Sequence, residues 1–152
     1  GKFKLFACGF ANIAHSRILR HPMQHLDPQA AYAFMQQRPE AVLVDCRTEI
    51  EFLYVGHPVG AEHVAWQEGP DWEVDPQFAA KVARVVKGDL SRPVLLICRS
   101  GNRSVDAGEA LEAAGFTKVI NVLEGFEGPL DDDYHRGTQG GWRFRGLPWY
   151  QT

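Results

Sequence analysis

Pro93-Val94-Leu95-Leu96-Ile97, followed at once by Cys98-Arg99-Ser100-Gly101-Asn102-Arg103-Ser104, is the stretch that decides the fold of this chain. The first five residues form a short apolar run bounded by proline, which is typical of a strand buried on both faces of a sheet. Residues 104–114 then space apolar side chains in a helical pattern that ends at Gly115, a residue suited to a helix C-terminus. A buried strand that leads through a short loop into a helix predicts a parallel α/β sheet, in which such loops bind ligands.

The same alternation of apolar runs and helical segments extends along the chain on both sides of this stretch. We expect strands over 41–45 and 119–123 and helices over 28–37 and 76–88. An Asp-Pro pair opens each of these helices, because aspartate caps a helix and proline suits its first position. Thr48 and Glu51 have capping-box spacing and predict a short helix that ends near Gly56. This order of elements indicates a mostly parallel sheet with helices between its strands.

The composition indicates one globular domain. The 152 residues are 45% hydrophobic and 23% charged, and their formal net charge is −3. This balance provides no basic field for nucleic acid and no cationic cluster for a membrane surface, so we expect small molecules or protein thiols as partners. We assign residues 25–152 to the domain. Residues 1–24 are interpreted as an N-terminal extension, either a targeting remnant or a segment added for expression.

The three cysteines, Cys8, Cys46 and Cys98, lack the spacing of a zinc site or a disulfide scaffold. Their odd number leaves at least one thiol free, which suits a reducing compartment and predicts a cytoplasmic location, with the periplasm as the alternative. Cys46 adjoins a predicted buried strand and is expected to be an inert core thiol. The histidines are scattered along the chain, and we expect no bound metal.

The loop that begins at Cys98 has the residues needed for thiol chemistry. A loop between a strand and a helix can turn successive backbone N–H groups inward, and the helix adds its positive N-terminal dipole. Such a nest favours a thiolate over a thiol at Cys98 and holds the outer sulfur of a persulfide, while Gly101 allows the tight turn. Arg99 and Arg103 can attract an anionic donor. In the alternative interpretation Cys98 only ends a core strand and both arginines face solvent.

Several motifs resemble the rhodanese family. They are Val44-Asp45-Cys46-Arg47, Glu51-Phe52, Gly56-His57, Gly60-Ala61, the loop from Cys98 to Ser104, Gly141-Trp142 and Gly146-Leu147-Pro148-Trp149. The resemblance extends over residues 26–150 and implies an α/β fold with a five-stranded parallel sheet flanked by helices on both faces. It also implies a single-domain thiosulfate:cyanide sulfurtransferase with a ping-pong reaction. A small anionic sulfur donor such as thiosulfate leaves sulfur on Cys98, and a thiol or cyanide acceptor removes it. No organic cofactor is implied.

The predicted site has three groups of residues. Cys98 is the nucleophile. The substrate-binding residues are those of the loop, namely Arg99, Ser100, Gly101, Asn102, Arg103 and Ser104. Structural support is expected from Asp45, Arg47 and Glu51. Arg47 is expected to pair with Glu51 or Glu49, and Asp45 to accept hydrogen bonds from loop amides beneath the site.

Two other functions remain open at this point. In the phosphatases related to the family, five residues separate the cysteine from the arginine, whereas four residues separate Cys98 from Arg103. The shorter loop suits a sulfane sulfur better than a tetrahedral phosphate, which leaves a cysteine-dependent phosphatase as the alternative enzyme. A non-catalytic rhodanese-like interaction module is the alternative outside enzymes, and persulfide formation distinguishes it.

Residues outside the loop receive mainly structural interpretations. His57 is expected in a structural turn. Trp66 and Trp72 are assigned either to the core or to the border of the active-site mouth. Residues 131–136, with three adjacent aspartates, depart from the family pattern and are interpreted as a solvated insertion near the active-site end of the sheet.

Overall fold

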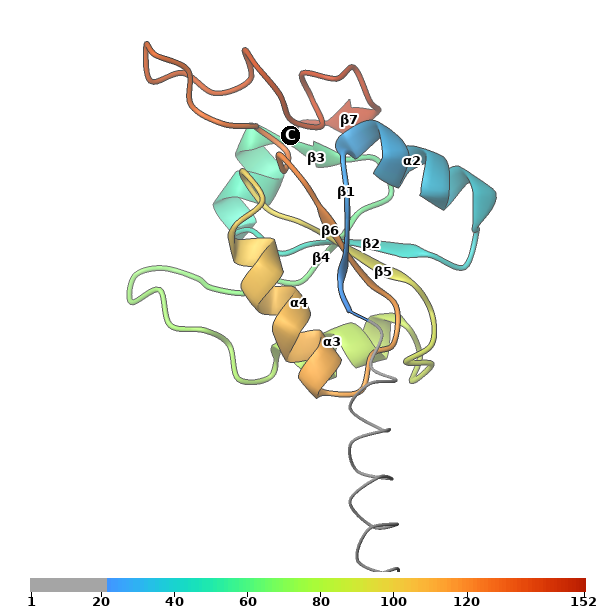
Figure 1. Cartoon of the computed structure of the whole chain (residues 1–152). Coiled ribbons are helices and arrows are strands. Elements are labelled where there is room, and N and C mark those ends of the chain that lie inside the picture. Colours follow the sequence, from blue (N-terminus) through green and yellow to red (C-terminus); the bar gives the residue numbers. More distant parts are fainter. Residues whose placement is uncertain (1–21) are drawn as a thin grey trace, which may run out of the picture.

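The computed structural model describes residues 22–152, so most of the predicted N-terminal extension, together with Cys8, lies outside the described residues. A five-stranded sheet forms the centre of the domain. Its strands, in spatial order, are β1 (Gln24–Leu26), β6 (Val119–Val122), β5 (Val94–Ile97), β2 (Val42–Asp45) and β4 (Glu62–His63). All four neighbouring pairs are parallel, which confirms the predicted sheet (Figure 1). Strand β5, which leads to Cys98, is its central strand.

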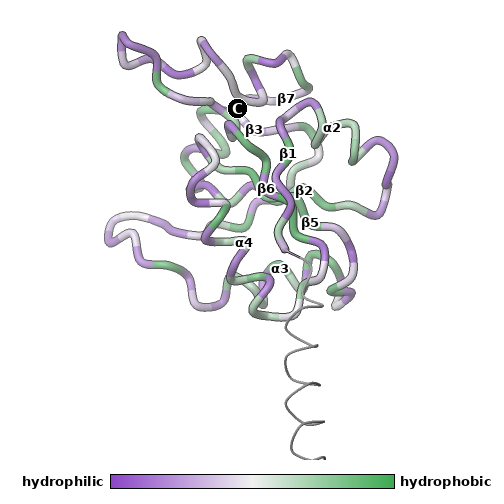
Figure 2. The backbone as a smooth tube through the Cα atoms, in the orientation of Figure 1, coloured by the Kyte–Doolittle hydropathy of each residue, from purple (hydrophilic) through white to green (hydrophobic). Residues whose placement is uncertain are grey.

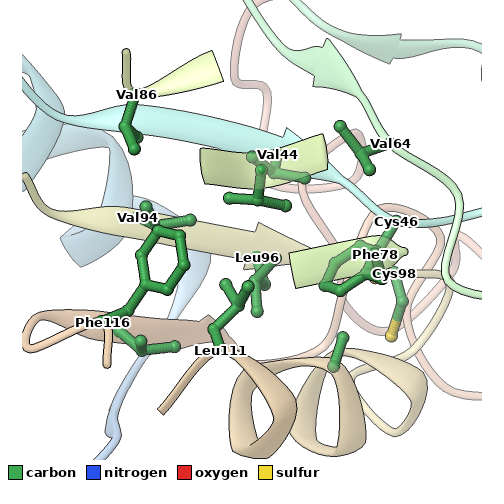
Figure 3. Close-up of a cluster of buried hydrophobic side chains, with 13 residues drawn as sticks. Val44, Cys46, Val64, Phe78, Val86, Val94, Leu96, Cys98, Leu111 and Phe116 are labelled. Carbon is green, nitrogen blue, oxygen red and sulfur yellow. The ribbon is translucent and has the colours of Figure 1, made fainter. Parts of the chain in front are cut away.

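Helices cover both faces of the sheet, as predicted. The alternation of side chains along β5 divides the core, because Val94 and Leu96 face one side and Leu95 and Ile97 the other. The first side packs against α3 (Phe78–Val85) and α4 (Arg103–Ala113), and Figure 3 shows this cluster. The second side packs against α2 (Pro28–Gln37). Figure 2 shows the hydrophobic stretches concentrated on the central strands.

The helix starts follow from local hydrogen bonds. Asp27 accepts the Ala30 N–H at 2.8 Å and caps α2, as the Asp-Pro pair predicts. The Thr48 hydroxyl and the Glu51 carboxylate form the predicted capping box, which opens the short helical segment η1 (Glu51–Val55). Helix α3 begins two residues later than expected from its proline, because the Asp75 carboxylate accepts the Gln77 N–H at 2.8 Å and forms a turn first.

The C-terminal segment returns to the carboxyl edge of the sheet. After β6 the chain runs through turns to β7 (Trp149–Tyr150), which pairs antiparallel with β3 (His57–Pro58) (Figure 1). Trp142 anchors this segment because it is 1% exposed, packs edge-on against Tyr32 of α2 and donates its indole N–H to the Pro148 carbonyl at 2.8 Å. In the described part of the chain, helices are too short or too polar to cross a membrane.

Candidate active site

Cys98 lies where the central strand ends. Its side chain continues the alternation of β5 and therefore points toward α4, on the same face as Leu96 (Figure 3). Only 1% of the residue is exposed. The sulfur accepts the Gly101 N–H at 3.1 Å and lies 3.2 Å from the Ser104 hydroxyl oxygen. The structure thus places one backbone donor and one hydroxyl of the predicted loop at the sulfur.

The described hydrogen bonds to the sulfur come from Gly101 and Ser104, and the other loop residues have different environments. Gly101 has a φ of +102°, a conformation that glycine adopts at little cost, and this turn directs its amide toward Cys98. Ser100 is half-buried, and Asn102 is exposed at the start of α4. Within residues 22–152, Gly101 supplies the backbone hydrogen bond to the sulfur. A role for the other amides in holding an outer sulfur stays a prediction.

The turn that follows β6 fixes the loop from the other side. The Phe126 N–H donates to the Cys98 carbonyl at 2.8 Å, and the Glu127 and Gly128 N–H groups donate to the Arg99 carbonyl at 2.9 and 3.2 Å. Gly125 allows the turn after β6 to lie this close to the backbone of the cysteine loop. It has a φ of +65°, and a Cβ added there would lie 2.5 Å from the Cys98 carbonyl oxygen. The conformation of the cysteine loop therefore depends on a turn that is more than twenty residues away in sequence.

The predicted pairing of Arg47 with Glu51 or Glu49 is wrong. Glu51 pairs instead with Arg103, whose two guanidinium nitrogens each lie 2.8 Å from a carboxylate oxygen. Burial alone would raise the pKa of Glu51, but hydrogen bonds from Arg103, its positive charge and the contacts with Thr48 outweigh burial and lower the pKa to about 2. The same hydrogen bond raises the pKa of Arg103. Arg103 therefore links the loop to η1 with its charge compensated.

Arg47 is fully buried and pairs with Asp45. Its Nη2 lies 2.6 Å from one carboxylate oxygen of Asp45, and its Nε donates to the other at 2.9 Å. Asp45 also accepts the Arg47 N–H at 3.1 Å, so the amide it binds belongs to its own segment and not to the Cys98 loop as expected. The guanidinium donates to the Gly56 carbonyl at 2.6 Å and lies 4.6 Å from the Phe126 ring centroid. Both residues are buried and make contacts within the fold, with partners that differ from those expected from the sequence.

A shallow cleft of about 460 Å³ opens above the loop. The residues that line it are Thr48, Glu51, Trp72, Arg99, Arg103, Glu127 and Arg136. Trp72 is 55% exposed and borders this mouth, whereas Trp66 packs edge-on against Phe78 in the core. Arg136 comes from the predicted insertion and donates to the Gly128 carbonyl at 2.8 Å. Within the described residues, neither Arg99 nor Arg136 is in an ion pair, so both present positive charge to the cleft.

Other polar residues of the predicted motifs have structural contacts. Cys46 is buried, donates to the Ile97 carbonyl at 3.4 Å, and burial, followed by the nearby Cys98, raises its pKa well above the ordinary value. A thiol in this state is a poor nucleophile, in agreement with its assignment as a core residue. The His57 and His63 rings bond to the Phe52 and Arg47 carbonyls at 2.9 and 2.7 Å.

The insertion is organised by one aspartate. Asp131 accepts N–H groups from Asp133 and His135 and the Thr138 hydroxyl, which lower the pKa of Asp131. Asp132 and Asp133 are exposed, as expected of a solvated loop. This turn places Arg136 at the cleft.

Sequence reasoning missed two polar contacts of the site. It assigned the backbone of Ser104 to the site but not its hydroxyl, and it did not assign Asn121. Asn121 is 1% exposed and accepts the Ser104 hydroxyl at 2.5 Å. The available signal was a single amide within the apolar run of Val119–Val122, because a polar side chain in a buried strand needs a partner.

Known proteins similar to this chain in sequence or in structure include rhodanese-like domains and sulfurtransferases. A family model described as "Rhodanese-like domain" matches residues 27–130. "Thiosulfate sulfurtransferase GlpE" of Haemophilus influenzae is 30% identical over 119 residues, which cover 74% of this chain and 99% of that protein. The crystal structure of Rv0390 from M. tuberculosis is 39% identical, with a TM-score of 0.75, and covers 85% of this chain and 98% of that one. The polysulfide-sulfur transferase homodimer from Wolinella succinogenes shares the fold at 23% identity, with a TM-score of 0.54. The match covers 97% of this chain and 90% of that one.

We predict that Gly125→Ala disrupts the cysteine loop. The new Cβ would displace the Cys98 carbonyl as well as strain the backbone, so we expect the free energy of unfolding to fall by roughly 2–4 kcal/mol. The control is Gly60→Ala, because Gly60 has a φ of +80° but no atom within 4 Å of an added Cβ. Urea denaturation measures both variants. If both variants lose the same free energy of unfolding, the loss comes from backbone strain alone and the contact with the Cys98 carbonyl contributes nothing.

The Glu51–Arg103 pair predicts a defined pH dependence of stability. Because the folded-state pKa of Glu51 is lowered to about 2 from 4.5, its stabilisation is present above pH 4.5 and is lost as the pH falls toward 2. Glu51→Gln should therefore lower the free energy of unfolding by roughly 2–3 kcal/mol at pH 7 and by progressively less below pH 4.5. Urea denaturation at several pH values tests this. A constant difference between variant and wild type would contradict the assigned pairing.

Proposed function

The chain belongs to the rhodanese-like family of sulfurtransferases, and we propose that it moves a sulfane sulfur from thiosulfate or a persulfide donor to a thiophilic acceptor through a persulfide on Cys98. The observation that carries this proposal is the position of the Cys98 sulfur. It lies at the end of the central strand and accepts the Gly101 N–H, and the loop that it begins contributes Arg99 and Arg103 to a cleft that Arg136 also lines. A thiolate at this point has a donor to stabilise it and a cationic entrance for an anion.

The reaction needs no redox partner and no cofactor. In the first half, the Cys98 thiolate attacks the sulfane sulfur of thiosulfate, the new S–S bond forms, and the S–S bond of thiosulfate breaks so that sulfite leaves with the electron pair. In the second half, cyanide or a thiolate attacks the outer sulfur. The S–S bond to Cys98 then breaks and returns its electron pair to Cys98. The Gly101 N–H stabilises the thiolate that is consumed and regenerated.

The position of Arg103 supports sulfur transfer over phosphate transfer. A cysteine-dependent phosphatase needs cationic donors around several phosphate oxygens. Two guanidinium nitrogens of Arg103 are occupied by the Glu51 carboxylate, and four residues separate this arginine from Cys98. A single sulfur atom requires fewer donors.

Since Cys46 and Cys98 are both free thiols, we further propose a reducing compartment, the cytoplasm, as the site of the reaction.

Thiosulfate treatment tests the nucleophile. We expect a mass increase of roughly 32, which corresponds to one sulfur atom, on the peptide that contains Cys98. Cys98→Ser should abolish the increase, Cys46→Ser should retain it, and cyanide should remove the added sulfur. Sulfur on the Cys46 peptide would refute the assignment of the nucleophile. Absence of sulfur together with Cys98-dependent hydrolysis of an aryl phosphate would favour the phosphatase, and absence of both reactions would favour the interaction module.

The two cleft arginines should guide the anionic donor. Arg99→Ala and Arg136→Ala are each expected to raise the KM for thiosulfate by about two- to fivefold, since an exposed charge attraction is worth up to about 1 kcal/mol. Both variants should also weaken the salt dependence of kcat/KM. Arg84→Ala, which removes an exposed positive charge from α3, is the matched control and should change neither quantity. An effect of equal size in all three would assign it to net charge and not to the cleft.

A further inference from the structure

Three polar side chains, those of Ser104, Asn121 and His25, connect the Cys98 sulfur to the surface of the domain. The sulfur lies 3.2 Å from the Ser104 hydroxyl oxygen, which donates to the Asn121 carbonyl oxygen Oδ1 at 2.5 Å. The Asn121 amide nitrogen lies 3.2 Å from Nδ1 of His25. Ser104 and Asn121 are buried, whereas His25 is exposed. The sheet register positions this chain, because Asn121 is the partner of Leu96 in β5 and of His25 in β1.

The direction of these hydrogen bonds limits what Ser104 can offer to the sulfur. A serine hydroxyl has one proton and can donate only one hydrogen bond at a time. While Ser104 donates to Asn121, it can only accept from Cys98. This arrangement fits the neutral thiol, whose S–H can donate, but it presents a lone pair to a thiolate or to the anion of a persulfide. For Ser104 to stabilise negative charge on the sulfur, its proton must therefore point toward Cys98 and away from Asn121.

The side chain of Asn121 allows that reversal. Rotation of an amide by a half-turn exchanges its oxygen and nitrogen with almost no change in shape. The Asn121 nitrogen then donates to the Ser104 oxygen, and the Ser104 proton is free to donate to the sulfur. The Asn121 oxygen faces Nδ1 of His25, which must now carry a proton. Because His25 is exposed, it can exchange that proton with solvent.

We propose that Asn121 is a positioning residue that lets the Ser104 hydroxyl accept a hydrogen bond from the Cys98 thiol and donate one to the Cys98 thiolate. The proposal rests on the proposed sulfur transfer, in which Cys98 alternates between charged and uncharged forms. An amide is suited to this position because it both donates and accepts. Aspartate has a similar shape, but its ionised carboxylate only accepts, and leucine does neither.

The test compares the reactivity of Cys98 toward iodoacetamide as a function of pH, followed by peptide mapping. Ser104→Ala removes the donor and should move the profile to higher pH, with a roughly tenfold lower rate at neutral pH. Asn121→Asp should have a similar effect, because the carboxylate holds the Ser104 proton away from the sulfur. Asn121→Leu leaves that proton free to donate to the sulfur and removes the acceptor that the proton uses beside the neutral thiol, so its profile should move to lower pH, opposite to that of Ser104→Ala. Ser91→Ala, an exposed serine in a turn, is the control.

A double variant separates the proposed route from a direct effect of charge. If Asn121 acts through Ser104, Asn121→Asp should cause no further shift in a Ser104→Ala background. Arg103 and Cys46, the pKa values of which are raised in part by the nearby Cys98, are unchanged in every variant. A further shift in the double variant, or an unchanged profile in Ser104→Ala, overturns the proposal. If the aspartate variant does not fold, Asn121→Leu decides alone: a shift of its profile to lower pH supports the proposal, and an unchanged profile or a shift to higher pH overturns it.

This readout does not depend on sulfur transfer. Alkylation reports on the thiolate of Cys98 whether or not thiosulfate is a substrate. If wild-type protein forms no persulfide, the proposed function fails while the alkylation profiles still decide the role of Asn121. If the persulfide forms but the profiles of the variants do not differ, only the role of Asn121 fails.

Discussion

The buried guanidinium of Arg47 is the interaction on which the carboxyl edge of the sheet depends. An isolated charge at 0% exposure would be very costly, so each contact of this side chain is a constraint on the segment that supplies it. Asp45 supplies the counter-charge from β2, Gly56 a carbonyl from the end of η1, and Phe126 a ring from the turn after β6. One side chain thereby fixes three segments that are far apart in sequence.

The Cys98 loop takes its shape from two of these segments. The turn that contains Phe126 donates hydrogen bonds to the Cys98 and Arg99 carbonyls, and η1 contributes Glu51, which binds Arg103 at the start of α4. The loop is therefore held at both ends by neighbours that Arg47 already orders. Preorganisation of this kind keeps the Gly101 amide directed at the Cys98 sulfur.

Patterns of apolar residues were sufficient to predict the three central strands, the helices and the position of Cys98, because burial and capping are local signals. The short strands β1, β3, β4 and β7 have two or three residues each, too few to show a pattern, and the expectation of five strands came from the family resemblance. The ion pairs were not predictable in the same way. Arg47 and Glu51 are four residues apart, a spacing that suggests a helical pair, but Arg47 precedes the helix and points into the core. The true partner, Arg103, is 52 residues from Glu51, and only the sheet brings them together.

Charge is compensated differently on the two faces of the sheet, and this difference suits the nucleophilic role proposed for Cys98. Permanent charge is neutralised on the side of Phe126, where Arg47 meets Asp45, and at the mouth, where Arg103 meets Glu51. On the side of α4, the sulfur contacts neutral dipoles: the Gly101 amide and the Ser104 hydroxyl. A fixed cation at that contact would stabilise the thiolate but would also hold it back from attack. A fixed amide together with a hydroxyl that can turn therefore suits the proposed reaction, in which negative charge on the sulfur appears and disappears.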